Sequence, residues 1–277
     1  MSDFATQPHY DAAAEFLRHF HLPAEEPSLP AIGRILAEFA RLPYENLSKI
    51  IKYCRCRDVN HLRFPGELLA DHQRFQLGGT CFALTFFLKT ILDSRGYETF
   101  VVMADMRSGA NSHCALVLNF GGRQYLLDPG YLIRRPLPLD GTTPGDHYYF
   151  TVESDPCRLA LWTPSGRQIR KRYTFRVMPT AWQNFHQFWQ DSFHWMTMHG
   201  ICLSKRDADG FLYLHNHYVK REGRDMQFKG HFNEPIAELA RLYFDIPPEI
   251  VSAAESALRE NLYSDRELGY QVPAWIK

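Results

Sequence analysis

Cys81 has the sequence context of a reactive thiol. It follows two glycines in the segment 77–82 (Leu-Gly-Gly-Thr-Cys-Phe) and begins a run with apolar residues at helical spacing, which ends at Arg95-Gly96. A thiol in the first turn of a helix lies at the positive end of the helix dipole, which favours the thiolate. The glycines leave the backbone open to a substrate carbonyl. Cys81 is therefore a candidate nucleophile; the alternative is a buried core cysteine at a helix start.

His113 is expected to face a carboxylate across a β-hairpin. It lies in the β-rich run 112–120, and Gly121-Gly122 is a typical two-residue turn before the return strand that ends at Asp128. Counting back from the turn places Ala115 opposite Asp128, so His113, two residues away on the same face, is its diagonal neighbour. Diagonal neighbours lie roughly 7–8 Å apart at the backbone, within reach of an imidazole–carboxylate hydrogen bond. The pattern therefore predicts an oriented histidine.

Together these residues have the chemistry of a Cys81–His113–Asp128 triad. The carboxylate would fix the histidine tautomer, the histidine would take the thiol proton, and the thiolate would attack an acyl carbonyl. The backbone N–H of Cys81 is one candidate donor to the oxyanion that forms. Each residue also has an ordinary interpretation: His113 as a hydrogen-bonded sheet histidine, and Asp128 as the residue that starts a turn at Pro-Gly.

Three segments resemble motifs of one enzyme family. Residues 41–47 (RLPYENL) resemble its R-x-P-F-E-N-L signature, and 78–82 (GGTCF) its R-G-G-x-C-F nucleophile motif. Residues 113–128 resemble its H-x-x-L-x-V … Y-L-V-D-V-G segment. The order and spacing agree, so the chain resembles the arylamine N-acetyltransferases over nearly its whole length.

The resemblance implies a function and a mechanism. Such an enzyme moves an acetyl or other short acyl group from acyl-coenzyme A, through an acyl-cysteine, to the nitrogen of an arylamine, a hydrazine or another amine. Acetyl-coenzyme A would be the co-substrate, no metal would take part, and the catalytic residues would be Cys81, His113 and Asp128. The sequence assigns no residue to coenzyme A binding.

The resemblance and the hydrophobic patterns together predict an α+β fold in three parts. A helical bundle over 1–95 would carry the nucleophile, an antiparallel β-barrel over 96–195 would carry the histidine and aspartate, and an α/β lid would form 196–277. The patterns predict helices over 11–20, 28–41, 65–72, 81–95, 180–193, 234–244 and 248–261. They predict strands over 98–106, 112–120, 123–128, 148–153, 158–162, 168–177, 201–207 and 211–221.

Several positions depart from the family pattern. Leu77 stands where the family has an arginine that pairs with the glutamate of its E-N-L motif, here Glu45. A buried carboxylate without that arginine is costly, so Glu45 is expected to be partly exposed or to pair with another base, Lys49 being the nearest in sequence. Ala83, Thr85 and Pro129 also differ from the usual residues. These changes leave the reaction class in place and bear on the acceptor.

Three other functions are compatible with the same triad. They are an amide synthase, a transglutaminase-like cysteine hydrolase, and a divergent member with weak arylamine activity or a binding role alone. The E-N-L signature with a C-terminal lid favours the acyltransferase over the transglutaminase-like hydrolase, but it does not separate an acetyltransferase from an amide synthase.

Composition excludes several other classes. The 31 Lys and Arg balance the 31 Asp and Glu, and the pI is about 7.2, so the chain is not expected to bind nucleic acid or a membrane surface. No segment approaches the ~20 apolar residues of a membrane span. Six cysteines in 277 residues do not make a disulfide scaffold, and a reducing cytoplasm is the expected setting.

His215-Asn216-His217 is the remaining cluster of titratable side chains. Within the predicted strand 211–221 both imidazoles would share one face. A zinc site would need a third ligand at a recognisable spacing, so a solvated strand face is the favoured interpretation.

Overall fold

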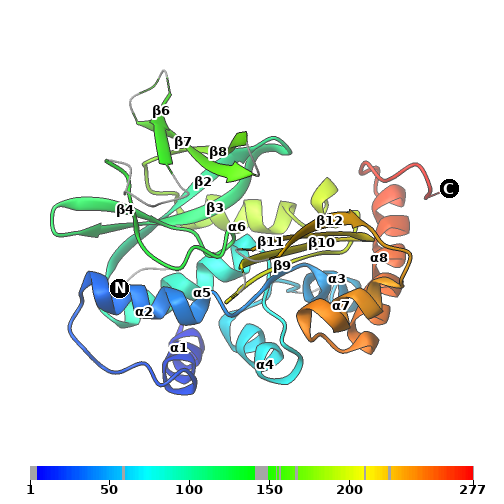
Figure 1. The fold of residues 1–277 in the computed structure, drawn as a ribbon, viewed down its shortest axis with the longest axis horizontal. Coiled ribbons are helices and arrows are strands. Elements are labelled where there is room, and N and C mark those ends of the chain that lie inside the picture. The colour runs from blue at the N-terminus through cyan, green and yellow to red at the C-terminus, as the bar shows by residue number, and fades with distance from the viewer. Residues whose placement is uncertain are drawn as a thin grey trace. The chain divides into compact units, whose positions relative to one another are not determined.

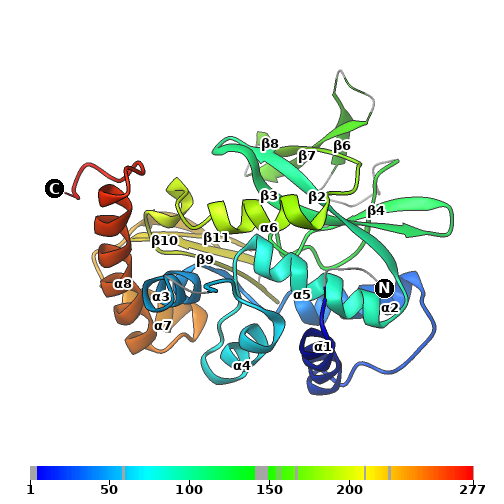
Figure 2. The same cartoon turned by 180° about the vertical axis from the view of Figure 1, so that it is seen from behind.

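The computed structural model describes residues 5–57, 60–140, 149–153, 155, 157–165, 168–208, 210–223 and 226–276 (Figures 1 and 2). The chain forms two compact units. The first unit consists of Met1–Phe39 and Leu84–Phe188, and the second unit of Ala40–Ala83 and Trp189–Lys277. Two of the three unit boundaries fall within helices, α5 (Cys81–Ser94) and α6 (Trp182–Asp191), and the third falls at the end of α2 (Leu29–Phe39). The three-part division at 1–95, 96–195 and 196–277 stays a prediction.

An antiparallel sheet dominates the first unit, with strands in the order β5-β4-β3-β2-β8-β7-β6. Its strands are β2 (Glu98–Met106), β3 (Gly109–Phe120), β4 (Arg123–Leu127), β5 (Leu137–Pro138), β6 (Tyr149–Val152), β7 (Arg158–Ser165) and β8 (Gln168–Arg176). The expected strands agree with these to within a few residues; Tyr148, the first residue of the expected strand 148–153, lies outside the described residues. Short edge strands β5 and β6 end the hydrogen-bonded order, so the described strands form a half-barrel instead of a closed barrel (Figure 1).

The two faces of β3 are buried in different ways. Ala115 and Val117 point into an apolar core that also contains Leu126 of β4 and Tyr173 and Phe175 of β8. The alternate residues are buried as well, which a strand covered on both faces requires. Because side chains alternate along a strand, His113 shares the face of Ala115 and Val117.

Helix α5 packs in the first unit with α1 (Gln7–His19) and α2 (Leu29–Phe39). The Phe87 ring centroid lies 5.6 Å from that of Phe16 in α1 and 5.5 Å from that of Phe39 in α2. Residues 81–92 are all buried, as expected for a helix that is apolar on most sides. The helix ends at Ser94, one residue before the expected limit, and is followed by Gly96 with φ 76°.

The second unit contains a five-stranded sheet in the order β1-β9-β10-β11-β12. Its strands are β1 (Tyr44–Glu45), β9 (Cys202–Asp207), β10 (Gly210–His215), β11 (Tyr218–Gly223) and β12 (Gln227–His231). Its helices are α3 (Leu47–Arg55), α4 (Pro65–Phe75), α7 (Ile236–Phe244), α8 (Pro248–Glu267) and the 3₁₀ turn Met196–Met198. One apolar core joins sheet residues such as Leu203 and Leu214 to α3, α7 and α8, which lie close together in both views (Figures 1 and 2). The sequence patterns did not predict β1, α3 or β12.

The expected strand 211–221 is wrong, because the chain reverses within it. Strand β10 ends at His215, which pairs with Tyr218 at the start of β11. Asn216 has φ 51°, a left-handed conformation that asparagine tolerates in tight turns. Its side-chain Oδ1 accepts a hydrogen bond from Ile201 N at 2.9 Å. His215 therefore ends β10 and His217 lies in the turn itself, so the two imidazoles do not share a strand face.

In the described part of the chain, every helix is too short or too polar to cross a membrane.

Candidate active site

His113 and Asp128 meet as the hairpin pattern predicted. The β3–β4 register pairs Phe120 with Arg123 and Leu116 with Leu127, and the turn glycines have φ 58° and 74°, as a type I′ turn requires. Asp128 follows the last residue of β4. His113 Nε2 lies 2.9 Å from Asp128 Oδ2. The predicted pairing of these two side chains is confirmed.

Asp128 is fully buried, and its carboxylate accepts three hydrogen bonds. Besides His113, the Tyr173 hydroxyl donates to Oδ2 at 2.6 Å, and the backbone N–H of Tyr131 donates to Oδ1 at 3.0 Å. A buried carboxylate is tolerated when its lone pairs are satisfied in this way. The three donors hold the carboxylate in one orientation toward the imidazole.

Two tyrosine rings enclose the imidazole of His113. Its ring centroid lies 4.9 Å from that of Tyr173 and 5.2 Å from that of Tyr131, the second in an edge-to-face arrangement. Tyr173 was not among the residues predicted from the sequence. The sequence does indicate that Tyr173 is buried, because it lies on the apolar face of the alternating strand 168–177. Its approach to Asp128, however, depends on the pairing of β8 with β2, at Phe175 and Ala104.

Cys81 is the first residue of α5, as the sequence predicted, and it is 7% exposed. It lies in the second unit, whereas His113 and Asp128 lie in the first. The next residue, Phe82, is buried in the second unit and stacks on Trp189 with ring centroids 6.5 Å apart. This packing fixes the first turn of the helix that carries the thiol.

Thr85 is one helical turn after Cys81 and is fully buried in the first unit. Its hydroxyl donates to the carbonyl oxygen of Cys114 at 3.4 Å. Cys114 directly follows His113 in β3. Of the positions that depart from the family pattern, Thr85 thus bonds to β3 through its side chain. At Pro129 the backbone carbonyl oxygen accepts a hydrogen bond from Leu132 N at 3.1 Å, which any residue at this position could do.

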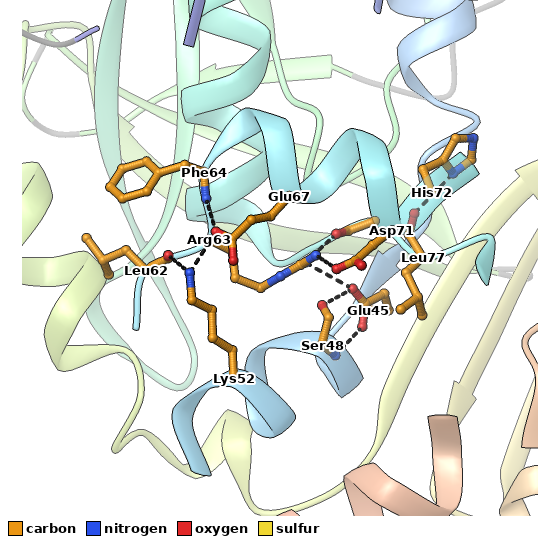
Figure 3. Close-up of polar contacts among 11 residues, drawn as sticks. Glu45, Ser48, Lys52, Leu62, Arg63, Phe64, Glu67, Asp71, His72 and Leu77 are labelled. Atoms are coloured by element: carbon orange, nitrogen blue, oxygen red, sulfur yellow. Dashed lines mark hydrogen bonds and ion pairs between the residues drawn. The ribbon is translucent and has the colours of Figure 1, made fainter. Parts of the chain in front are cut away.

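The expectation for Glu45 is confirmed in part: it pairs with another base, but that base is not Lys49, and Glu45 is not exposed. Glu45 is 0% exposed, and Lys49 instead donates to the Oγ and the carbonyl oxygen of Ser192. The basic residue beside Glu45 is Arg63, whose Nη1 lies 3.6 Å from Glu45 Oε1 (Figure 3). The positively charged partner that Leu77 cannot provide for Glu45 is therefore supplied by an arginine from the segment before α4.

Glu45 also caps helix α3. The backbone N–H of Ser48 donates to Glu45 Oε2 at 3.0 Å, and the Ser48 hydroxyl donates to Oε1 (Figure 3). A carboxylate at a helix N-terminus satisfies an N–H group that has no partner within the helix and interacts favourably with the dipole. Glu45 is thus held by Ser48 on one side and Arg63 on the other.

Asn46 and Leu47 complete the E-N-L segment. Asn46 Nδ2 donates to Gly200 O at 2.7 Å, and its Oδ1 accepts from Cys202 N at 2.8 Å, so this side chain joins the start of α3 to the start of β9. Leu47 is buried in the core of the second unit. All three residues of the signature are therefore structural supports near the loop that precedes Cys81.

Among the residues that the structure describes, no group of three or more His, Cys, Asp or Glu side chains could hold a metal ion. All six cysteines lie in the described residues, and none forms a disulfide.

The chain is similar to known proteins in sequence pattern and in fold. The model of a family described as N-acetyltransferase matches residues 28–250. No curated protein sequence matches the chain. The arylamine N-acetyltransferase of Salmonella typhimurium superposes with a TM-score of 0.72 at 16% identity, covering 91% of this chain and 100% of that one.

Two further solved structures are similar. The arylamine N-acetyltransferase of Mycobacterium marinum in complex with CoA gives a TM-score of 0.72 at 18% identity, covering 90% of this chain and 97% of that one. The arylamine N-acetyltransferase of Bacillus cereus, described as having a unique Cys-His-Glu catalytic triad, gives a TM-score of 0.66 at 17% identity. The match covers 89% of this chain and 100% of that one. With the family model matching most of its length, the chain belongs to the N-acetyltransferase family, and its α+β fold is that of the arylamine N-acetyltransferases.

Proposed function

We propose that this protein transfers an acetyl group from acetyl-coenzyme A to an amine nitrogen, and that Cys81, His113 and Asp128 are its catalytic triad. The observation that carries the proposal is the buried hydrogen bond of 2.9 Å between His113 Nε2 and Asp128 Oδ2. A carboxylate that accepts from one ring nitrogen leaves the other, Nδ1, to exchange protons with a nucleophile.

Two features support Cys81 as that nucleophile. It begins helix α5, where the helix dipole favours the thiolate. One turn later in the same helix, Thr85 bonds to the residue after His113, and residues one turn apart are separated by about 5–6 Å along the helix. Membership of the N-acetyltransferase family supports the reaction class.

The first half of the reaction forms the acyl-enzyme. His113 takes the proton of Cys81 at Nδ1, while Asp128 stabilises the imidazolium through Nε2. The thiolate attacks the thioester carbonyl, and backbone N–H groups of the first turn of α5, which lack partners within the helix, stabilise the oxyanion. When the intermediate collapses, the bond from carbon to the coenzyme A sulfur breaks, and the leaving thiolate takes the proton from His113.

The second half transfers the acetyl group. The acceptor nitrogen attacks the acyl-cysteine carbonyl and gives a proton to His113, and the bond between carbon and Cys81 Sγ breaks. The thiolate and the imidazolium are then restored. A thioester intermediate suits this sequence, because exchange between two thioesters is nearly isoenergetic and the acyl-cysteine remains reactive toward amines.

Intact mass spectrometry tests the proposal. Mixing the protein with acetyl-coenzyme A, without an acceptor, should add one acetyl group, and Cys81→Ala should add none while keeping its circular dichroism spectrum. Adding an arylamine or a hydrazine should then discharge the acetyl group. Discharge that is equally fast without any amine would identify a hydrolase instead, and a Cys81→Ala variant that kept most of the turnover would refute the triad.

A further inference from the structure

We propose that Arg63 is a positioning residue for Cys81, because its guanidinium holds the loop that presents the thiol. The inference rests on the proposed function, since it concerns how the nucleophile of that reaction is aligned. All the residues involved belong to the second unit.

The three peptide carbonyls that precede Thr80 are each held by a donor from another part of the second unit. The bonds are His72 Nδ1 to Leu77 O at 3.0 Å, Arg63 Nη1 to Gly78 O at 2.7 Å, and Glu45 N to Gly79 O at 3.1 Å. Of these donors, only the arginine and the histidine are side chains. The orientation of successive peptide planes before Cys81 is therefore set from outside the loop.

The loop also has little room to shift. Gly79 N donates to Pro43 O at 3.3 Å, and Gly79 forms a bridge with Tyr44. A Cβ placed on Gly78 would lie 2.0 Å from Pro43 O, so no other residue fits at this position. The loop is thus pressed against β1 on one side, while the Arg63 guanidinium holds the Gly78 carbonyl.

Arg63 is itself anchored on both sides (Figure 3). The Leu62 carbonyl accepts a hydrogen bond from Lys52 Nζ, and Phe64 N donates to Glu67 Oε2 at 3.1 Å. Lys52 Nζ and Glu67 Oε2 in turn lie 2.7 Å apart. The backbone of Arg63, whose side chain is only 3% exposed, is therefore fixed independently of the loop that it contacts.

The guanidinium uses its forked shape. Nη1 reaches Gly78 O and lies near Glu45, while Nη2 donates to the partly exposed Asp71 of α4. An ammonium group has no fork and cannot reproduce this set of directions. The charge of Arg63 therefore balances the buried Glu45 carboxylate, and its geometry aligns the Gly78 carbonyl.

Cys81 follows Gly78 by three residues and begins α5. The directions of its Sγ and of the N–H groups in the first turn follow the loop that enters the helix. A misplacement of reacting groups by about 1 Å can reduce a rate by about 10²-fold. Arg63 should therefore affect the reactivity of Cys81 and the rate of acyl transfer without contacting acetyl-coenzyme A.

The test compares Arg63→Lys with the wild type and with Arg221→Lys, a control whose guanidinium binds Asp207 on the β-hairpins of the same unit. Three quantities are measured: the melting temperature, the rate at which iodoacetamide alkylates Cys81, and kcat and KM for acetyl-coenzyme A. We expect Arg63→Lys to lower the alkylation rate and kcat about tenfold or more with KM unchanged. Arg221→Lys should match the wild type in both rates.

Alkylation and turnover within twofold of the wild type in folded Arg63→Lys would overturn the inference. If that variant does not fold, Asp71→Asn decides, because it loosens the guanidinium and leaves the pair with Glu45: a fall in the alkylation rate supports the inference, and an unchanged rate refutes it. Alkylation needs no acyl donor, so a wild-type protein that fails to take up acetyl would refute the proposed function while leaving this comparison valid.

Discussion

His113 Nε2 and Asp128 Oδ2 are 2.9 Å apart at a site where the two side chains are 4% and 0% exposed. The same carboxylate oxygen accepts the Tyr173 hydroxyl at 2.6 Å. A single oxygen thus joins the proposed base to a strand, β8, that contributes no residue to the triad. The orientation of the imidazole depends on this shared contact.

Tyr173→Phe should weaken both stability and catalysis. The change removes a hydrogen bond to a buried charged group, which corresponds to about 1.5–3 kcal/mol of unfolding free energy. It also frees the Asp128 carboxylate to rotate, so kcat/KM should fall about tenfold, equivalent to about 1.4 kcal/mol of transition-state stabilisation. Urea unfolding and steady-state kinetics measure the two effects.

Tyr125→Phe is the matched control, because Tyr125 is a buried tyrosine of β4 outside the proposed site. It should change kcat/KM by less than a factor of two. Equal losses of activity in the two variants would show that Tyr173 has only a general packing role.

Iodoacetamide labelling should separate Cys81 from another cysteine of the same unit. Burial raises the pKa of the Cys202 thiol to about 12, partly offset by a hydrogen bond from Tyr213, so Cys202 should stay unlabelled near neutral pH. Cys81, at a helix N-terminus and served by His113 in the proposed triad, should be labelled at pH 7 as the thiolate. Peptide mass spectrometry after timed exposure measures both sites.

His113→Ala should slow the labelling of Cys81 and leave Cys202 unchanged. A labelling profile for Cys81 that is centred near ~8.5, the value of an ordinary thiol, and that is the same in the wild type and in His113→Ala would rule out a thiolate–imidazolium pair.

Glu45→Gln should be strongly destabilising. Glu45 is fully buried, accepts two hydrogen bonds from Ser48, and lies beside the guanidinium of Arg63. The neutral amide would leave the buried guanidinium of Arg63 with only the partly exposed Asp71 carboxylate as a charge partner among the described residues and would direct an NH₂ group at other donors; breaking a buried ion pair in this way costs about 3 kcal/mol or more. Urea unfolding of the variant gives the free-energy difference.

Glu238→Gln is the comparison for this prediction, since Glu238 pairs with Arg241 on the surface of α7, where the two side chains are 49% and 59% exposed. Such a pair contributes less than about 1 kcal/mol. If Glu45→Gln lowers the free energy of unfolding no more than Glu238→Gln does, the buried pair of Glu45 and Arg63 contributes nothing to stability.

The features that the sequence predicted are those set by short-range rules. The two glycines at 121–122 determine the turn, the turn determines the register, and the register brings His113 to Asp128. Helix α5 begins and ends within one residue of the limits indicated by its apolar spacing and its terminal glycine. These elements could be predicted because a few neighbouring residues determine them.

The features that the sequence did not predict depend on pairings between distant segments. Arg63 and Glu45 are 18 residues apart, and nothing in the spacing indicates that the segment before α4 returns to β1. Tyr173 reaches Asp128 only because β8 pairs with β2. The turn at Asn216 was missed for a different reason: one asparagine without a following glycine is a weak turn signal, and the alternation of apolar residues continues on both sides of it.

His199 should make the protein less stable in mild acid. Burial lowers its pKa below the ordinary value of 6.5, an effect that the Asp265 carboxylate and a backbone hydrogen bond with Gln271 only partly offset. Its Nε2 is buried and makes no hydrogen bond within the described residues. Below pH 6.5 the unfolded chain takes up a proton at His199 that the folded chain does not bind. The free energy of unfolding therefore falls as the pH drops, until the lower pKa of the folded state is passed.

Urea unfolding of the wild type and of His199→Leu, from pH 8 to pH 5, tests this prediction. Plotted against pH, the free energies of unfolding of the two proteins should run parallel above pH 7, and below it the wild type should lose more stability than the variant. Parallel curves down to pH 5 would show that His199 takes up its proton equally in the folded and unfolded chains.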